Sequence, residues 1–268
     1  MEFSRPGSIE EAASVKAADP GAQLLAGGTD LMVEVNFGLT APEHVIGLRR
    51  IDELAEYDDC RIGAGVTWSR LESCSHRALA QAARTVGSPQ IRAAGTIGGN
   101  IGTSSPAGDG LPWLAAAEAD IEVFSKSSGT RRISWRDFFT GVKTNALEAD
   151  EVIVAALVPD DVPTNQEFGK VGQRSAMVIS TVSACVMRSH DGSVRVALGA
   201  VAPTPLRALQ AEALVSGVPA PSESLLEEFA RTVAAEVRPI TDHRSTEAYR
   251  RHASGVLARR LLERCLAQ

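Results

Sequence analysis

Two glycine-rich segments contain the residues whose types and spacing could do chemistry. The longer one runs from Thr96 to Asp109 and combines four glycines with several small hydroxyl residues. The shorter one, Ala26 to Leu31, lies about seventy residues earlier. A backbone with little side-chain bulk can approach a ligand closely, and glycine can adopt positive φ angles that aim successive N–H groups at an anion. Either segment alone could be a structural turn, but the pair predicts a dinucleotide held at its pyrophosphate.

The remaining reactive residues give no support to several other function classes. The cysteines are too far apart to form the close pairs that metal sites and iron–sulfur clusters use, so we expect them to be small buried residues. No two histidines are spaced three or four residues apart, and neither H-E-x-x-H nor G-x-S-x-G occurs, so metalloenzyme and hydrolase functions have no basis. The cysteines are Cys60, Cys74, Cys185 and Cys265, and the histidines are His44, His76, His190, His243 and His252.

Composition and charge limit the kinds of partner and the cellular location that we expect for the chain. The chain has 268 residues, a formal net charge of −6, and a hydrophobic fraction of 44%. A nucleic-acid partner would normally leave a basic footprint, so none is expected. No apolar run reaches the ~20 residues of a membrane span, and the first residues lack an apolar signal core. We therefore expect a cytoplasmic protein of two or three domains.

Residues 1–55 read as a small βαβ-like unit. Ser8 is a suitable N-cap for a helix to about Ala18, and a strand at 22–25 leads into the short glycine segment. Thr29 or Asp30 can cap a second helix, through Asn36, and a strand follows at His44–Gly47. The glycines thus lie where a strand becomes a helix, a position that favours a phosphate.

Residues 56–165 form the second predicted unit. We expect a strand at 60–65 and an alanine-rich helix over His76–Val86, which Gly87-Ser88-Pro89 ends before the longer glycine loop. A helix over Asp109–Ala117 and strands at 120–124 and 151–158 complete the unit.

Residues 166–268 differ in character from the rest. Two β-like stretches, 178–187 and 193–201, flank an Asp-Gly hairpin signal, and helices occupy the remainder. The Pro-, Asp- and Thr-containing stretch 159–166 is the best domain linker. Strands followed by helices in this way indicate an α+β fold.

Four stretches, in this order and spacing, carry a resemblance over nearly the whole chain. They are 24–31 (L-L-A-G-G-T-D-L), 96–109, 168–174 (F-G-K-V-G-Q-R), and 242–250 with the helix that follows. Together they resemble the FAD-binding medium subunit of the molybdenum hydroxylases, the group of xanthine and aerobic carbon monoxide dehydrogenases.

The resemblance implies a PCMH-type FAD-binding domain of two α+β subdomains, 1–55 and 56–165. A carbon monoxide dehydrogenase flavoprotein carboxy-terminal domain, a small antiparallel sheet plus helices, would follow over 166–268. It also implies FAD as the cofactor and two partner chains, a large molybdopterin-binding subunit and a small [2Fe–2S] subunit. Electrons would pass from the clusters to FAD and on to an acceptor, whether NAD, a quinone, a ferredoxin or oxygen.

The same resemblance implies which residues contact FAD. It places the first glycine segment around the pyrophosphate and the start of the second opposite, with backbone N–H groups and the Thr96 hydroxyl satisfying phosphate oxygens. Asp109 would accept from ribityl or ribose hydroxyls, Ile153 would lie near the adenine, and Lys170 near the isoalloxazine, where a cation favours a reduced anionic flavin. The full set is Leu25, Ala26, Gly27, Gly28, Thr29, Asp30, Leu31, Thr96, Ile97, Gly98, Gly99, Asn100, Ser105, Asp109, Ile153 and Lys170. The resemblance implies neither a catalytic acid or base nor a metal ligand in this chain.

Alternatives stand beside these assignments. Taken alone, Asp109 would be an N-cap for the helix that follows it, and Lys170 a solvent-exposed lysine at a strand end. Val86 stands where some relatives place a phenylalanine near the flavin ring, and a valine cannot stack in the same way. The whole chain could also be a flavin-binding assembly or regulatory module without redox turnover, or a self-contained flavin reductase.

Overall fold

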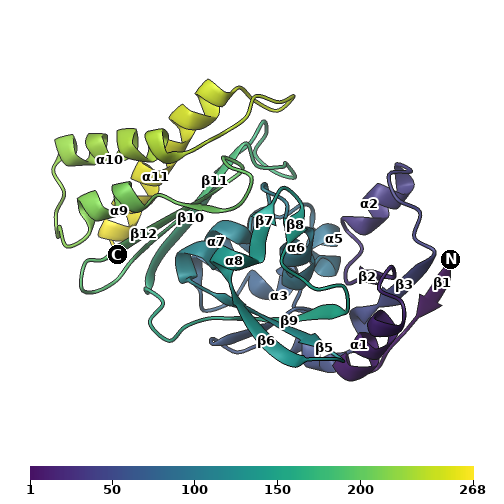
Figure 1. Cartoon of the computed structure of the whole chain (residues 1–268). Coiled ribbons are helices and arrows are strands. Elements are labelled where there is room, and N and C mark those ends of the chain that lie inside the picture. The colour runs from purple at the N-terminus through teal and green to yellow at the C-terminus, as the bar shows by residue number, and fades with distance from the viewer.

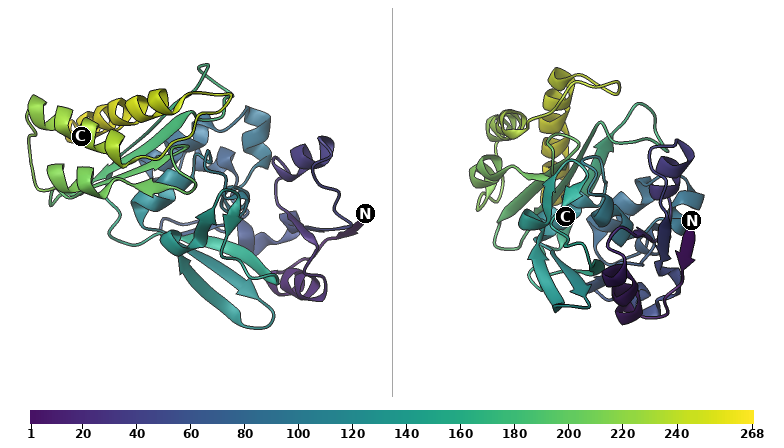
Figure 2. Two further views of the ribbon diagram at one scale, coloured as in Figure 1. Left: turned by 45° about the horizontal axis from the view of Figure 1, so that its top comes forward. Right: turned by 45° about the vertical axis from the view of Figure 1, so that its right-hand side comes forward.

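The chain forms three β-sheets, a small hairpin and eleven α-helices in a computed structural model that describes residues 1–268 (Figure 1). The amino-terminal elements lie at one end of the molecule and helices α9, α10 and α11 at the other, an arrangement that the further views repeat (Figure 2). This mixed architecture confirms the predicted α+β fold. No helix combines the length and apolar character that crossing a membrane requires.

The first sheet is parallel, with the strand order β1-β3-β2. Its elements are β1 (Glu2–Ser4), α1 (Ile9–Ala18), β2 (Gln23–Leu25), α2 (Leu31–Asn36) and β3 (His44–Gly47). Ser8 caps α1 by accepting a hydrogen bond from the Glu11 N–H, as predicted, whereas Asp30 at the start of α2 makes no side-chain cap. Strand β1 was not predicted, because its three residues are too few to show a period.

The second sheet is antiparallel, with the order β4-β9-β5-β6, and α1 packs against β9 and β5. Its strands are β4 (Arg61–Gly63), β5 (Asp120–Ser125), β6 (Gly129–Ser134) and β9 (Glu151–Leu157). Around it lie α3 (Trp68–Leu71), α4 (Arg77–Thr85), α5 (Pro89–Ala94), α6 (Ile97–Thr103), α7 (Leu111–Ala117), α8 (Trp135–Phe138) and the hairpin β7 (Phe139–Gly141) to β8 (Thr144–Asn145). Two 3-10 turns, Leu48–Arg50 and Asp52–Ala55, join the first sheet to this region. All of α7 is buried, which is why its sequence is a continuous apolar run.

The third sheet, β10-β11-β12-β13, is antiparallel and buries both of its faces. Cys185 and Met187 belong to the large core around α7, while the alternate residues Ala184 and Val186 face the core under the terminal helices. The elements are β10 (Asn165–Val171), β11 (Val182–Arg188), β12 (Val194–Gly199), β13 (Leu206–Arg207), α9 (Leu209–Val215), α10 (Glu223–Glu236) and α11 (Glu247–Leu266). The expected hairpin and terminal helices are therefore confirmed, although β11 begins four residues later than predicted.

Two sequence expectations are wrong. The longer glycine segment is not a loop throughout, because α6 runs through Gly98 and Gly99. Not every cysteine is buried either: Cys185 and Cys265 are, but Cys60 is exposed and donates to the Asp160 carboxylate.

Candidate functional site

The first glycine segment presents a row of unpaired backbone donors. None of the six N–H groups from Ala26 to Leu31 donates a hydrogen bond within the protein. Gly28 has φ +71°, a left-handed conformation that favours glycine. Unpaired backbone N–H groups between a strand and a helix are suited to binding an anion.

The structure brings the two glycine segments together. A Cβ at Gly27 would overlap the carbonyl oxygen of Ala94, so only glycine lets the first segment pack against the turn before α6. On the same side, the Thr103 hydroxyl lies 3.2 Å from an Asp30 carboxylate oxygen. The predicted proximity of the two segments is therefore present in the fold.

The second segment differs from its predicted form. The N–H groups of Ile97 and Gly98 donate to Val66 and Ala64, at 3.0 and 2.9 Å, and the Gly99 N–H donates to the Thr96 hydroxyl. These three amides therefore already have acceptors within the fold, unlike those of the first segment. The second segment supplies a wall of small residues.

The glycines in that wall serve different purposes. A Cβ at Gly98 would lie only 2.6 Å from the Ala64 carbonyl oxygen, so this glycine is required by helix packing. A Cβ at Gly99 would meet only the Thr96 hydroxyl, at 3.2 Å. Open space therefore lies beside Gly99, where a ligand can approach the helix.

Of two further predicted residues, Asn100 lies on α6 and Ile153 lies beneath it. The Asn100 side chain sits against Gly108 and Gly110, and its Oδ1 is buried without a hydrogen-bond partner. An unpaired buried acceptor is costly, so this atom is suited to a donor that the protein does not supply. Ile153, on β9, is buried and would lie 3.4 Å from a Cβ at Gly102, beneath the same helix.

Asp109 and Lys170 form a buried ion pair. The Lys170 ammonium lies 2.7 Å from the Asp109 carboxylate and also donates to the carbonyl oxygens of Thr85 and Val178, both at 3.0 Å. The second Asp109 oxygen accepts from the Ser180 hydroxyl at 2.5 Å. Burial raises the pKa of the Asp109 carboxyl above its ordinary value, against the opposing effect of the Lys170 ammonium.

This pair corrects two of the alternatives from the sequence. Asp109 is not the N-cap of α7, because Gly110 occupies that position and makes no side-chain cap. Lys170 is not a solvent lysine, since only 9% of its side chain is exposed. The sequence reasoning missed the third member of the cluster, Ser180, for which no local signal exists.

Two other polar sites lie apart from the glycine segments. The Ser4 hydroxyl, His44 and Asp19 form a chain of 2.9 Å hydrogen bonds that fastens β1 and β3 to the end of α1.

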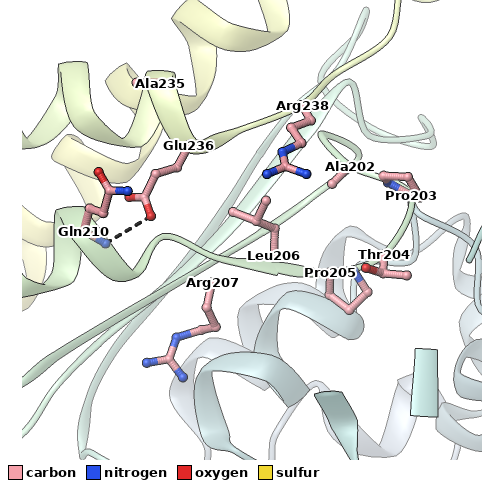
Figure 3. A pocket seen from close by; sticks show the side chains of 10 residues that line it. All are labelled: Ala202, Pro203, Thr204, Pro205, Leu206, Arg207, Gln210, Ala235, Glu236 and Arg238. Carbon is pink, nitrogen blue, oxygen red and sulfur yellow. Dashed lines mark hydrogen bonds between the residues drawn. The ribbon is translucent and has the colours of Figure 1, made fainter. Parts of the chain in front are cut away.

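Figure 3 shows a pocket between the β12–β13 connection and α9 and α10, where the Glu236 carboxylate accepts from the N–H groups of Gln210 and Ala211 at 3.0 Å. None of the predicted site residues lines that pocket. Its lining residues are Ala202, Pro203, Thr204, Pro205, Leu206, Arg207, Gln210, Ala235, Glu236 and Arg238.

Comparison with known families identifies the kind of domain that contains the glycine segments. Residues 1–161 match the model of the FAD binding domain in molybdopterin dehydrogenase, and residues 167–265 match the CO dehydrogenase flavoprotein C-terminal domain. The chain belongs to this flavoprotein family. The predicted family, its fold and its cofactor, FAD, are thereby confirmed, and the chain is a flavoprotein oxidoreductase subunit.

Individual flavoproteins of the family resemble the chain over most of its length. The nicotinate dehydrogenase FAD-subunit of Eubacterium barkeri is 35% identical over 245 residues, covering 84% of this chain and 82% of that protein. The xanthine dehydrogenase FAD-binding subunit of Escherichia coli O157:H7 is 30% identical, covering 99% and 96%. In the solved carbon monoxide dehydrogenase of Hydrogenophaga pseudoflava, a chain superimposes with a TM-score of 0.90 at 31% identity, covering 100% of this chain and 97% of that one.

The residues present fit the flavoprotein cofactor. FAD carries a pyrophosphate, which needs donors, and the first glycine segment offers unpaired N–H groups where it packs against the start of the second. The unpaired Asn100 acceptor lies on the same helix as Gly99. The family assignment and the local chemistry of these residues therefore agree.

Proposed function

We propose that this chain is the electron-transfer subunit of a molybdenum-dependent hydroxylase, accepting electrons from [2Fe–2S] clusters of a partner chain. The observation that carries the proposal is the row of unpaired amides from Ala26 to Leu31, which suits the FAD pyrophosphate. Bound FAD supplies a redox group that can exchange electrons singly or in pairs, and the electrons would leave for an acceptor such as NAD. The relatives named as medium chains and FAD subunits support the division of labour among several chains.

In this proposal, different residues contact different parts of FAD. The Ala26–Leu31 amides hold the pyrophosphate, Gly99 gives it room, and Asn100 Oδ1 accepts from a hydroxyl or amino group of the cofactor. In this proposal Ser105 and Ile153 also contact FAD, Ile153 on the adenine side; Ile153 is buried beneath α6. Asp109 and Lys170 act as one unit, because each already neutralises the other. The pair orients the ribityl and isoalloxazine end while keeping its net charge near zero.

The partners in this proposal are a large molybdopterin-binding subunit and a small [2Fe–2S] subunit. Two surfaces are candidates for their contacts: the rim around the flavin and the exposed face of α11. On α11, Arg259 forms ion pairs with Glu223 and Glu263. Arg260 and Arg264 are exposed and form no ion pair. Arginine is favoured at interfaces because its planar fork makes several hydrogen bonds at once.

The function is tested on the purified chain and on the co-expressed complex. Acid or heat release followed by chromatography should yield FAD, and the complex should show flavin bleaching when the substrate of its molybdenum subunit is added under anaerobic conditions. NADH-driven bleaching would identify NAD as an acceptor. A complex that contains FAD but never shows bleaching would instead support the assembly or regulatory module, and failure of both partner chains to bind would overturn the subunit proposal.

A further inference from the structure

Helix α2 continues directly from the first glycine segment and is weakly packed. None of its six residues is buried. Met32 and Val33 are exposed, and so are Phe37 and Leu39 just beyond the helix. The two views of Figure 2 show α2 standing at the edge of the molecule. Apolar burial is the main force that fixes a helix in a protein, so little of that force holds this helix or the glycine segment attached to it.

Polar contacts from the turn between β7 and β8 hold helix α2 in place instead. The Lys143 ammonium lies 2.6 Å from the Glu34 carboxylate on α2 and 3.7 Å from that of Asp30 in the glycine segment. Lys143 itself sits in the turn between β7 and β8, where it has φ +54° and its N–H donates to the Ser104 carbonyl at the end of α6. Its backbone is thus tied to one glycine segment and its side chain to the other.

The charges at this contact also matter for an anionic ligand. Asp30 and Glu34 bring two carboxylates to the end of the segment whose amides are unpaired, and carboxylates repel a pyrophosphate. Lys143 is the cation that offsets both of them. Its hydrogen bond with Glu34 raises the pKa of Lys143 above its ordinary value, so the ammonium stays charged at neutral pH.

We propose that Lys143 is a positioning residue for FAD, which clamps α2 and the first glycine segment against the second and so slows release of the cofactor. The inference rests on the proposed use of these segments to hold FAD. Without the ammonium, α2 loses its anchor and two uncompensated carboxylates remain beside the pyrophosphate. Both effects favour departure of FAD.

The test measures FAD release from the loaded holoprotein by the recovery of flavin fluorescence after dilution. Lys143→Met should release FAD about three- to tenfold faster at low ionic strength, as expected for loss of two half-exposed ion pairs. Glu34→Gln also breaks the clamp but removes one of the two repelling carboxylates and leaves Lys143 beside Asp30, so it should accelerate release less than Lys143→Met. The difference from the natural protein should shrink toward zero near 1 M salt, where the screening length is about 3 Å. Lys126→Met is the matched control, because Lys126 is exposed and forms no ion pair.

A charge reversal distinguishes clamping from a general effect on the fold. Lys143→Glu alone should release FAD fastest, and combining it with Glu34→Lys should restore part of the lost retention. If Lys143→Met released FAD at the natural rate, the clamp would be refuted while FAD binding itself stood. If the natural chain held no FAD at all, the proposed function would fail first.

Discussion

The Asp109 carboxylate and the Lys170 ammonium lie 2.7 Å apart, although the two residues are 61 positions apart in the sequence. Asp109 precedes helix α7 and Lys170 lies on strand β10, so the pair ties the long glycine segment to the third sheet. Side-chain exposure is 7% for Asp109 and 9% for Lys170. A buried pair of this kind is costly to break, because removal of one partner strands the other charge away from water.

Removal of the cation should therefore destabilise the protein strongly. We expect Lys170→Met to lower the free energy of unfolding by about 3–5 kcal/mol, as for other broken buried pairs. The double variant Lys170→Met with Asp109→Asn should lose less, since the stranded charge is gone. Urea denaturation followed by circular dichroism measures both. A loss below about 1 kcal/mol in the single variant would mean that the pair is hydrated, contrary to its burial.

Two glycine substitutions should separate packing from cofactor contact. Gly27→Ala overlaps the Ala94 carbonyl, so it should cost about 1–3 kcal/mol of stability and also weaken FAD binding. Gly99 has no positive φ, and an added Cβ meets only the Thr96 hydroxyl, at a tight 3.2 Å, so the Gly99→Val apoprotein should lose no more than about 1 kcal/mol of stability. FAD titration should nevertheless show at least about tenfold weaker binding for Gly99→Val. Wild-type affinity in a folded Gly99→Val protein would show that no cofactor lies beside α6.

The contrast between these glycines shows what the sequence could and could not predict. Ser8 and the strand His44–Gly47 were found because caps and apolar runs are local signals. The helix through Gly98 and Gly99 was missed, since glycine disfavours helices and only the close packing of Gly98 on Ala64 makes it necessary.

The site was predicted less completely than the fold. The resemblance supplied Asp109 and Lys170 as separate contacts, but their mutual pairing and the role of Ser180 depend on chain segments far apart in sequence. Lys143 had no signal at all, because a lysine in a turn is usually solvated.

Acid should weaken the ion pair between Asp242, in the segment before α11, and Arg250 on that helix. Burial alone would raise the pKa of Asp242, but the N–H groups of Arg244 and Ser245 and the Arg250 guanidinium lower it well below its ordinary value. The stabilisation is complete above the unfolded pKa, about 4 for an aspartate, and is lost as the pH falls toward the lower folded value.

The measurement is urea denaturation at a series of pH values from 7 down to 3. Relative to the natural chain, Asp242→Asn should be less stable near pH 7, and the gap should narrow below pH 4. A gap that is independent of pH would rule out ionisation of Asp242 as its source.

The central claim is that the backbone amides from Ala26 to Leu31 hold the FAD pyrophosphate, and hydrogen–deuterium exchange tests it most directly. Exchange is followed by mass spectrometry on the apoprotein and on the FAD-loaded chain, with peptides that separate Ala26–Leu31 from Ile97–Gly99. The account predicts fast exchange at Ala26–Leu31 without FAD and marked protection with it, whereas the amides of Ile97–Gly99, already bonded within the fold, are protected in both states. Saturation with FAD that leaves exchange at Ala26–Leu31 unchanged would contradict the account.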